Sequence, residues 1–309
     1  MKNFITTLFL SLLIMSCSSD DTIDPPKVEE TPEESETPII GDTDDDSDTE
    51  DDENSNTNRK KLASIESSYD NGDTFWIANY DSSNRPTTSY DDKDRLVHEF
   101  SYEHSDHYMP IRKDIYSAGT LISSATYIYD DSNRLIQHLT GTVASNRTFE
   151  YDTNTIIIRF ESLPNHYTKL FLDNLNRLSK IEEHDEEDSN DNITAIIDFE
   201  YENNNLIQIR KEDVIYGLNS YTSNYTFDDK QNPFYNQFEE YNINYILESS
   251  FDLEQRVLQI FSKNNYISNS LEESSRTLEY TSDDYPSTIN FTYKDYYNQV
   301  TLENYNYQN

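Results

Sequence analysis

The chain lacks several features on which common active sites depend. It has a single cysteine, Cys17, and only five glycines in 309 residues. Phosphate-binding loops, dinucleotide-binding loops and the Gly-x-Ser-x-Gly turn of serine hydrolases all need glycines at fixed spacings, and none of these patterns occurs. One cysteine also excludes a disulfide framework and a cluster of thiolate metal ligands. The sequence therefore predicts no catalytic residue and no cofactor-binding motif.

Positive charge is scarce as well. The chain carries 60 acidic and 23 basic residues, which gives a formal net charge of −37. Residues 18–58 hold 17 acidic residues against one lysine, and residues 59–309 hold 43 acidic and 21 basic residues. Because a surface this negative repels nucleic acid and anionic lipid headgroups, we expect neither as a direct partner.

The N-terminus has the pattern of an export signal. Lys2 precedes an apolar run from Phe4 to Met15, which at about 12 residues is too short to span a membrane but suits a signal peptide. The run ends in Ile14-Met15-Ser16-Cys17, which resembles the lipobox of bacterial lipoproteins. The resemblance implies that residues 1–16 are removed and that Cys17 carries the acyl chains that anchor the protein in the membrane.

Residues 17–58, which start with the lipidated cysteine, are predicted to be a disordered acidic linker. They contain no aromatic residue, and four prolines stand among dense Asp, Glu, Ser and Thr. Such a segment cannot bury enough apolar surface to offset the entropy of ordering it. Ser18-Ser19-Asp20-Asp21 resembles the acidic export signal of Bacteroidota-type surface lipoproteins, which implies exposure on the cell surface, at the outer face of the outer membrane. The alternative is that these residues only begin the linker.

Residues 59–309 are predicted to form one all-β domain. Runs such as Tyr127-Ile128-Tyr129 and Phe199-Glu200-Tyr201 place two aromatic side chains on one face of a strand. No segment shows sustained helical spacing with clear caps. We therefore expect antiparallel β-hairpins that form one extended or curved sheet.

A short motif recurs through this domain. Its clearest copies are Tyr90–Leu96, Tyr129–Leu135 and Leu172–Leu178, and looser copies begin at Tyr80, Tyr201, Phe227, Phe251 and Tyr280. Within a copy, the aspartate can bond backbone amides of a tight turn, and the Asn or Asp before the arginine tolerates a left-handed backbone. Each copy therefore predicts a strand end, a turn and a strand start.

Three copies carry an apolar residue three positions after the one that opens the return strand. The pairs are Leu178 with Ile181, Leu206 with Ile209, and Val257 with Ile260. An odd spacing predicts opposite faces of a strand, so both faces of the sheet would be partly covered.

The motif resembles the YD repeat of RHS-type proteins, whose usual form is Tyr-Asp-x-x-Gly-Arg-Leu, over most of residues 80–293. In that family the repeats build long antiparallel sheets that wind into an extracellular shell or strip. This chain has Asn or Asp at the glycine position, irregular spacing and no large toxin segment after the repeats. It is similar to the smaller, degenerate YD-repeat lipoproteins of Bacteroidota-type bacteria, and that resemblance implies fold and location more than activity.

Two groups of side chains are candidates for ligand binding. Phe75, Trp76, Tyr80 and Tyr90 could stack on a sugar, or they pack a half-buried strand face. Asp185, Glu187, Asp188 and Asp191 lie in an acidic run that could bind calcium weakly, or they form a solvated loop. No other cofactor is predicted.

The function that the sequence predicts is that of a membrane-anchored extracytoplasmic lipoprotein. Its β-repeat domain would be a non-catalytic binding or scaffold module, with an envelope protein or a glycan as partner. The alternative is an enzyme that cleaves an extracellular polysaccharide with Asp or Glu carboxylates. A deep cleft with two convergent carboxylates would favour the enzyme.

Overall fold

A computed structural model of the chain describes residues 59–69, 71–104, 108–141, 145–186, 191–215, 217, 220–238, 241–248, 253–271, 275–292 and 300–308. They belong to the unit Ser55–Asn309. The predicted signal peptide, the lipidation site Cys17 and the acidic linker lie outside the described residues.

The described residues form 18 strands and two short helices, which confirms the all-β prediction. The elements in chain order are β1 (Leu62–Tyr69), β2 (Thr74–Tyr80), β3 (Pro86–Asp91), β4 (Leu96–Ser101), β5 (Arg112–Ser117), β6 (Thr120–Tyr129), β7 (Leu135–Leu139), β8 (Arg147–Asp152), β9 (Thr155–Phe160), β10 (Leu163–Leu172), β11 (Leu178–Asp185), β12 (Asn192–Glu202), β13 (Asn205–Asp213), β14 (Tyr221–Gln231), α1 (Asn242–Glu248), α2 (Leu253–Phe261), β15 (Asn264–Asn269), β16 (Ser275–Tyr280), β17 (Pro286–Thr292) and β18 (Val300–Tyr307).

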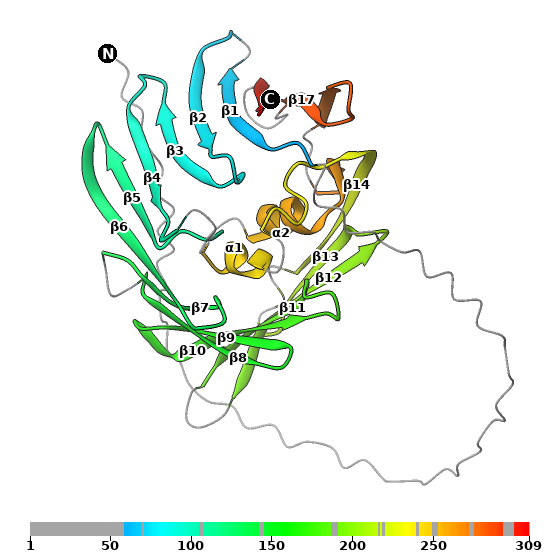
Figure 1. Cartoon of the computed structure of the whole chain (residues 1–309). Helices are drawn as coiled ribbons and strands as arrows, with labels where there is room; N and C mark the ends of the chain where they lie inside the picture. The colour runs from blue at the N-terminus through cyan, green and yellow to red at the C-terminus, as the bar shows by residue number, and fades with distance from the viewer. Residues whose placement is uncertain are drawn as a thin grey trace, which may run out of the picture. The chain divides into compact units, whose positions relative to one another are not determined.

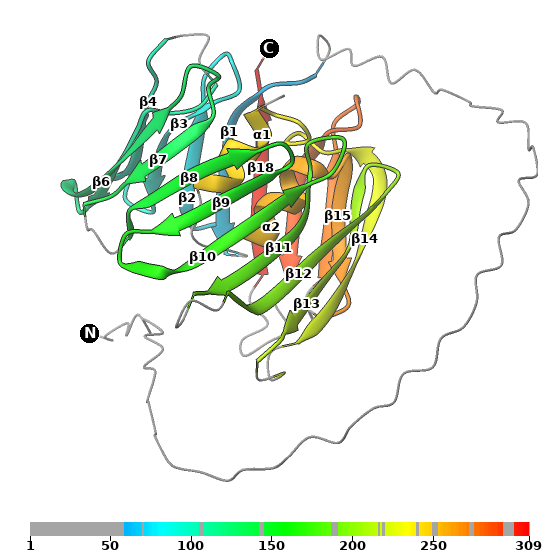
Figure 2. The same ribbon diagram turned by 90° about the horizontal axis from the view of Figure 1, so that it is seen from below.

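The strands form one curved sheet. Consecutive strands pair antiparallel from β1 to β15 and again from β16 to β18. The last strand, β18, pairs antiparallel with the first, β1. This pairing brings the two ends of the meander together, and the sheet becomes a nearly closed, barrel-like ring around α1 and α2 (Figures 1 and 2).

A shared turn explains the repeated motif. In one copy, the Asn133 amide donates to the Asp130 carbonyl (2.9 Å) and the Asp130 amide donates to the Arg134 carbonyl (3.0 Å). The carboxylate oxygen Oδ1 of Asp130 also accepts the amides of Ser132 (2.9 Å) and Arg134 (3.0 Å). Asn133 has φ = 57°, the left-handed conformation that closes a type I turn with a bulge. The same backbone geometry recurs at 81–85, 91–95 and 173–177.

A tyrosine of the following hairpin completes the motif. Arg177 donates to Asp173 (Nε to Oδ2, 2.8 Å), and its guanidinium lies 4.2 Å from the ring centroid of Tyr201. The hydroxyl of Tyr201 donates to the Leu178 carbonyl (2.8 Å), on the strand that leaves the turn. The same contacts link Arg134 with Tyr151, and Arg85 with Tyr102. The turns at 81–85, 130–134 and 173–177 are therefore each tied to the next hairpin.

A β-bulge follows these turns and corrects one expectation. Phe171 pairs with Lys180 but Leu172 pairs with Leu178, so β11 has one extra residue beside Leu178. Because a bulge shifts the alternation by one residue, Leu178 and Ile181 share the inner face, where they are 0% and 3% exposed. Leu206 and Ile209 on β13 behave in the same way. The prediction that these pairs lie on opposite faces was wrong, because it assumed unbulged strands.

The two helices are a second difference from the sequence-based expectation. The looser motif copies at 227–233 and 251–257 are not hairpin turns, since β14 continues to Gln231 and Leu253–Val257 lies in α2. Val257 and Ile260 are therefore i and i+3 on one helix face, and both are fully buried. Helices of seven and nine residues are too short to show a sustained helical period.

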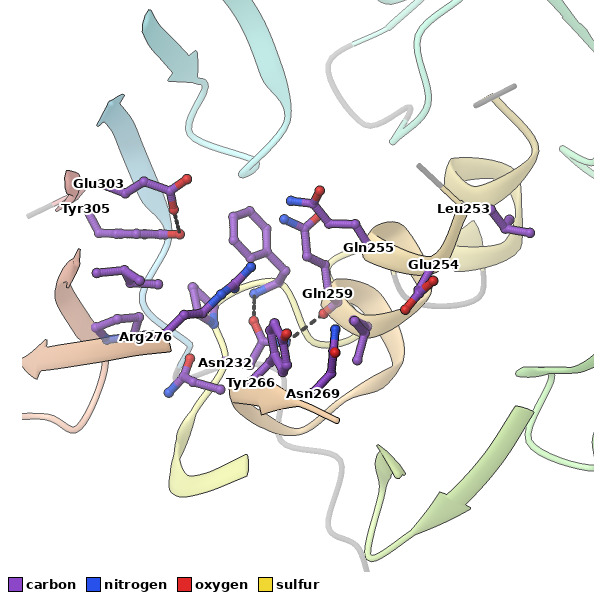
Figure 3. A pocket seen from close by; sticks show the side chains of 16 residues that line it. Asn232, Leu253, Glu254, Gln255, Gln259, Tyr266, Asn269, Arg276, Glu303 and Tyr305 are labelled. Carbon is purple, nitrogen blue, oxygen red and sulfur yellow. Dashed lines mark hydrogen bonds between the residues drawn. The ribbon is translucent and has the colours of Figure 1, made fainter. Parts of the chain in front are cut away.

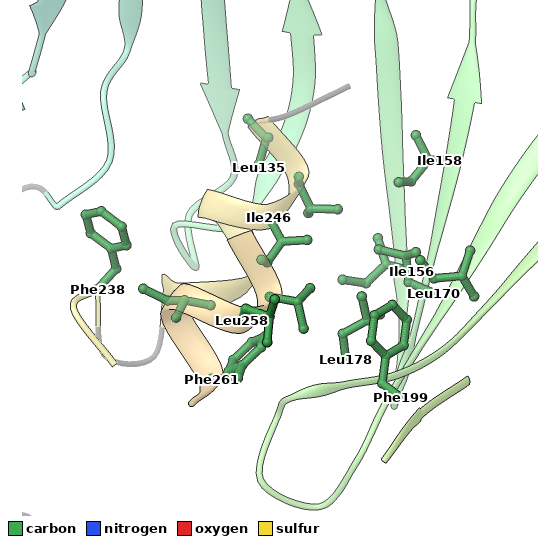
Figure 4. Close-up of a cluster of buried hydrophobic side chains, with 14 of the residues drawn as sticks. Leu135, Ile156, Ile158, Leu170, Leu178, Phe199, Phe238, Ile246, Leu258 and Phe261 are labelled. Carbon is green, nitrogen blue, oxygen red and sulfur yellow. The ribbon is translucent and has the colours of Figure 1, made fainter. Parts of the chain in front are cut away.

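The core lies between these helices and the inner face of the sheet (Figure 4). Ile246 of α1 and Phe261 of α2 face Leu135, Ile156, Leu170 and Leu178 of the strands, and all six are at most 2% exposed. Each such side chain stabilises the fold by about 1.5–3 kcal/mol. Neither described helix is long and apolar enough to cross a membrane.

Candidate functional site

A cavity of about 450 Å³ lies inside the ring, between α2 and the inner faces of β15 to β18 (Figure 3). Apolar side chains, including Leu253 and Leu258 of α2 and Ile289 of β17, form part of its wall. Gln255 of α2 lines the cavity and is exposed, so the cavity reaches solvent at this helix.

The strand side of the cavity carries an arginine, a glutamate and a tyrosine. The Arg276 guanidinium lies 4.3 Å from the ring centroid of Tyr266 and 4.8 Å from that of Phe291. Its Nε atom is buried and has no hydrogen-bond partner among the described residues. Tyr305 donates to Glu303 (Oη to Oε2, 2.8 Å), and burial raises the pKa of Tyr305, so its hydroxyl stays protonated.

Side-chain amides from α2 and from the end of β15 also line the cavity. Gln255 and Gln259 project from α2, and Asn269 ends β15 (Figure 3). Asn232 donates to the Gln259 carbonyl (2.7 Å) and accepts the Phe234 amide (2.9 Å), so it fixes the turn that brings Phe234 to the cavity. Amide groups are both donors and acceptors, and they match ligand hydroxyls.

The lining offers groups that can bind the hydroxyls of a ligand. The guanidinium, the amides and the Glu303 carboxylate can bond hydroxyl groups, and Tyr266 and Phe234 add aromatic surface to the lining. The two carboxylates of the lining, Glu254 and Glu303, come from α2 and β18, on opposite sides of the cavity (Figure 3). They do not form a neighbouring pair.

The sheet separates the four predicted stacking residues. Trp76 pairs with Ser67, and Tyr80 packs against the inner cluster of Leu62, Ile289 and Tyr305, so Trp76 and Tyr80 lie on the inner face. Tyr90 pairs with Ile77, so Tyr90 lies on the outer face. Phe75 is the extra residue of a β-bulge between Thr74 and Trp76, and its ring centroid lies 4.6 Å from that of Tyr69. The Trp76 ring contacts that of His98 edge-on at 5.4 Å. The four residues therefore do not form one stacking surface.

The predicted calcium ligands are only partly described. Asp191 accepts the Tyr167 hydroxyl at Oδ2 (2.8 Å) and contacts His184 Nδ1 at Oδ1 (2.8 Å). Asp185 lies 3.8 Å from His166 Nδ1. Glu187 and Asp188 lie outside the described residues. Within the described residues, no group of three acidic, His or Cys side chains could hold a metal ion.

Sequence reasoning missed the cavity residues. Arg276, Tyr266 and Glu303 lie outside the clear repeat copies, and no motif marks them. The sequence contains a partial signal. Glu303 and Tyr305 are two positions apart on one strand, and so are Arg276 and Leu278, so each pair lies on one face of its strand. The contact of β16 and β18 with α2 around one cavity, however, depends on the closure of the sheet.

Comparison with known proteins gives low similarity. No protein-family model and no curated protein matches the chain. Among solved structures, the chain is similar to a porin-like protein from Bacteroides uniformis ATCC 8492 (12% identity, TM-score 0.39, 80% of this chain and 98% of that one). It is also similar to a porin-like protein from Bacteroides vulgatus ATCC 8482 (12%, 0.28, 81% and 99%) and to TcdB2-TccC3 (14%, 0.30, 76% and 15%). None of these likenesses assigns an activity to this chain.

Proposed function

We propose that this chain is a YD-repeat-like lipoprotein of the outer membrane, exposed on the cell surface, whose barrel-like domain binds a saccharide without cleaving it. The observation that supports this proposal most is the composition of the 450 Å³ cavity, where a guanidinium, amides and an aromatic ring face one space. Sugars present many hydroxyls and an apolar C–H face, and this lining complements both.

The charged outer face of the sheet agrees with attachment to the membrane through a lipid on Cys17 and not through the strands. That face carries charged pairs such as Arg112 with Asp114 (2.8 Å) and Arg210 with Asp198 (2.7 Å). Hydrocarbon would not solvate such charges, so we place the sheet outside the bilayer and assign the membrane contact to the acyl chains. The linker then sets the distance between domain and membrane.

A thermal melt of the full-length chain, purified in detergent, tests the binding proposal against a panel of surface polysaccharides. A ligand at 100 times its dissociation constant stabilises the fold by about 2.7 kcal/mol, which is a measurable shift. We expect a shift with at least one polysaccharide, which Arg276→Gln removes and Arg210→Gln, on the outer face, retains. The absence of any shift across the panel would refute saccharide binding.

A further inference from the structure

A second, smaller cavity of about 170 Å³ lies inside the ring beside the first. Phe234 lines both cavities. The smaller one is walled by aromatic side chains, including Phe100, Tyr102 and Tyr127, and it also contains Lys113, Glu248 and Arg256. At about 30 Å³ per water molecule in the liquid, its volume corresponds to about five or six waters, which is the scale of a single sugar ring.

Glu248 is a buried carboxylate with one oxygen that no described residue satisfies. It ends α1, and its side chain is 7% exposed. Its Oε2 lies 3.8 Å from Arg256 Nη1, whereas its Oε1 is buried and accepts no hydrogen bond from the described residues. Burial raises its pKa to about 7. A buried carboxylate oxygen lowers the stability of the fold unless a hydrogen-bond donor reaches it.

Three cations face this one carboxylate. Arg256 and Lys113 line the small cavity, and Arg147 donates to the Glu248 backbone carbonyl (Nη2 to O, 2.9 Å). Lys113 Nζ is 5.4 Å from the ring centroid of Phe100, and burial lowers the pKa of Lys113. Glu248 is the carboxylate that these cations share, so the cluster has excess positive charge inside a domain whose overall charge is strongly negative.

We propose that the small cavity is a subsite for one sugar ring that carries a carboxylate. The ligand carboxylate accepts from Lys113 and balances the excess charge, and a ligand hydroxyl donates to Oε1 of Glu248. The aromatic walls pack against the ring. The proposal rests on the proposed saccharide-binding function and adds the class of sugar, which is an acidic residue of the glycan. The negative net charge of the domain would by itself repel such a residue, so its binding depends on the local cations.

Calorimetric titration of the full-length chain with D-glucuronate and D-glucose tests this subsite, because the two sugars differ only at C6. We expect glucuronate to bind at least about tenfold more tightly, the scale of one charge-assisted hydrogen bond. Lys113→Gln should abolish that preference, whereas Lys211→Gln on β13, outside the cavity lining, should retain it.

Equal affinity of the wild type for both sugars, or binding of neither, would overturn the subsite. Loss of the preference in both lysine variants would also overturn it, because the effect would then come from overall charge. The polysaccharide panel separates the two proposals. If a polysaccharide stabilises the protein but glucuronate has no advantage, the subsite is wrong and saccharide binding stands. If no polysaccharide stabilises it, saccharide binding itself is wrong.

Discussion

Replacing Asp130 by Ala tests whether the motif aspartate holds the hairpin turn. Asp130 accepts two backbone amides and the Arg134 guanidinium, whereas its neighbour Asp131 is exposed and takes part in none of these bonds. Loss of a side chain that caps backbone amides costs about 0.5–2 kcal/mol. The Arg134 side chain is 51% exposed, so solvent screening leaves its ion pair with little effect on stability. The free energy of unfolding should therefore fall by about 0.5–2 kcal/mol.

Urea denaturation of the full-length chain, followed by far-ultraviolet circular dichroism, measures this loss. The matched control is Asp131→Ala, which should change the free energy of unfolding by less than about 0.5 kcal/mol. Burial opposes the ionisation of Asp130, but hydrogen bonds from Arg134 and Ser132 hold its pKa below the usual value. The stabilisation is therefore present at neutral pH and disappears as the pH falls through the lowered pKa. Equal losses in the two variants would refute the role assigned to Asp130.

Three further predictions concern stability. Leu178→Ala, at a fully buried bulge position, should cost about 2–5 kcal/mol in urea denaturation, and a cost below about 1 kcal/mol would contradict the packing described. Asn176→Gly should be tolerated because Asn176 has φ = 57°, whereas Asn176→Ala should cost about 1 kcal/mol; the reverse order would exclude a left-handed turn. Burial raises the pKa of Glu248 to about 7, so ionisation destabilises the wild type as pH rises from about 4.5 to 7. Over that range the stability of Glu248→Gln relative to wild type should rise by up to about 3 kcal/mol, and a pH-independent difference would contradict the raised pKa.

Local chemistry made the repeated turns predictable from the sequence. Asp at the start of the turn and Asn before the arginine have side chains suited to bonding amides and adopting positive φ, and the structure places Asp173 and Asn176 in those roles. The link from Tyr201 to Leu178 was not predictable, because it joins residues 23 apart on different hairpins. The bulge beside Leu178 was also missed, since one extra residue leaves no mark in an alternating pattern.

The candidate site was not predictable from the sequence. The sequence left an envelope protein and a glycan open as partners, and the aromatic residues that it named for stacking include Trp76 and Tyr90, which point to opposite faces of the sheet. The cavity joins Arg276 and Glu303 to the α2 helix, and that meeting depends on the pairing of β1 with β18. A closure between residues more than 200 positions apart is set by the whole sheet, so no local pattern contains it.

Calorimetric titration with the polysaccharide that stabilises the chain most, followed by size analysis of the recovered polymer, tests the central claim most directly. The account predicts that wild type and Arg210→Gln bind with the same affinity, that Arg276→Gln binds at least about tenfold more weakly, and that the polymer is recovered intact. Unchanged binding by Arg276→Gln would place the site outside the cavity, and a shortened polymer would show that the protein is an enzyme.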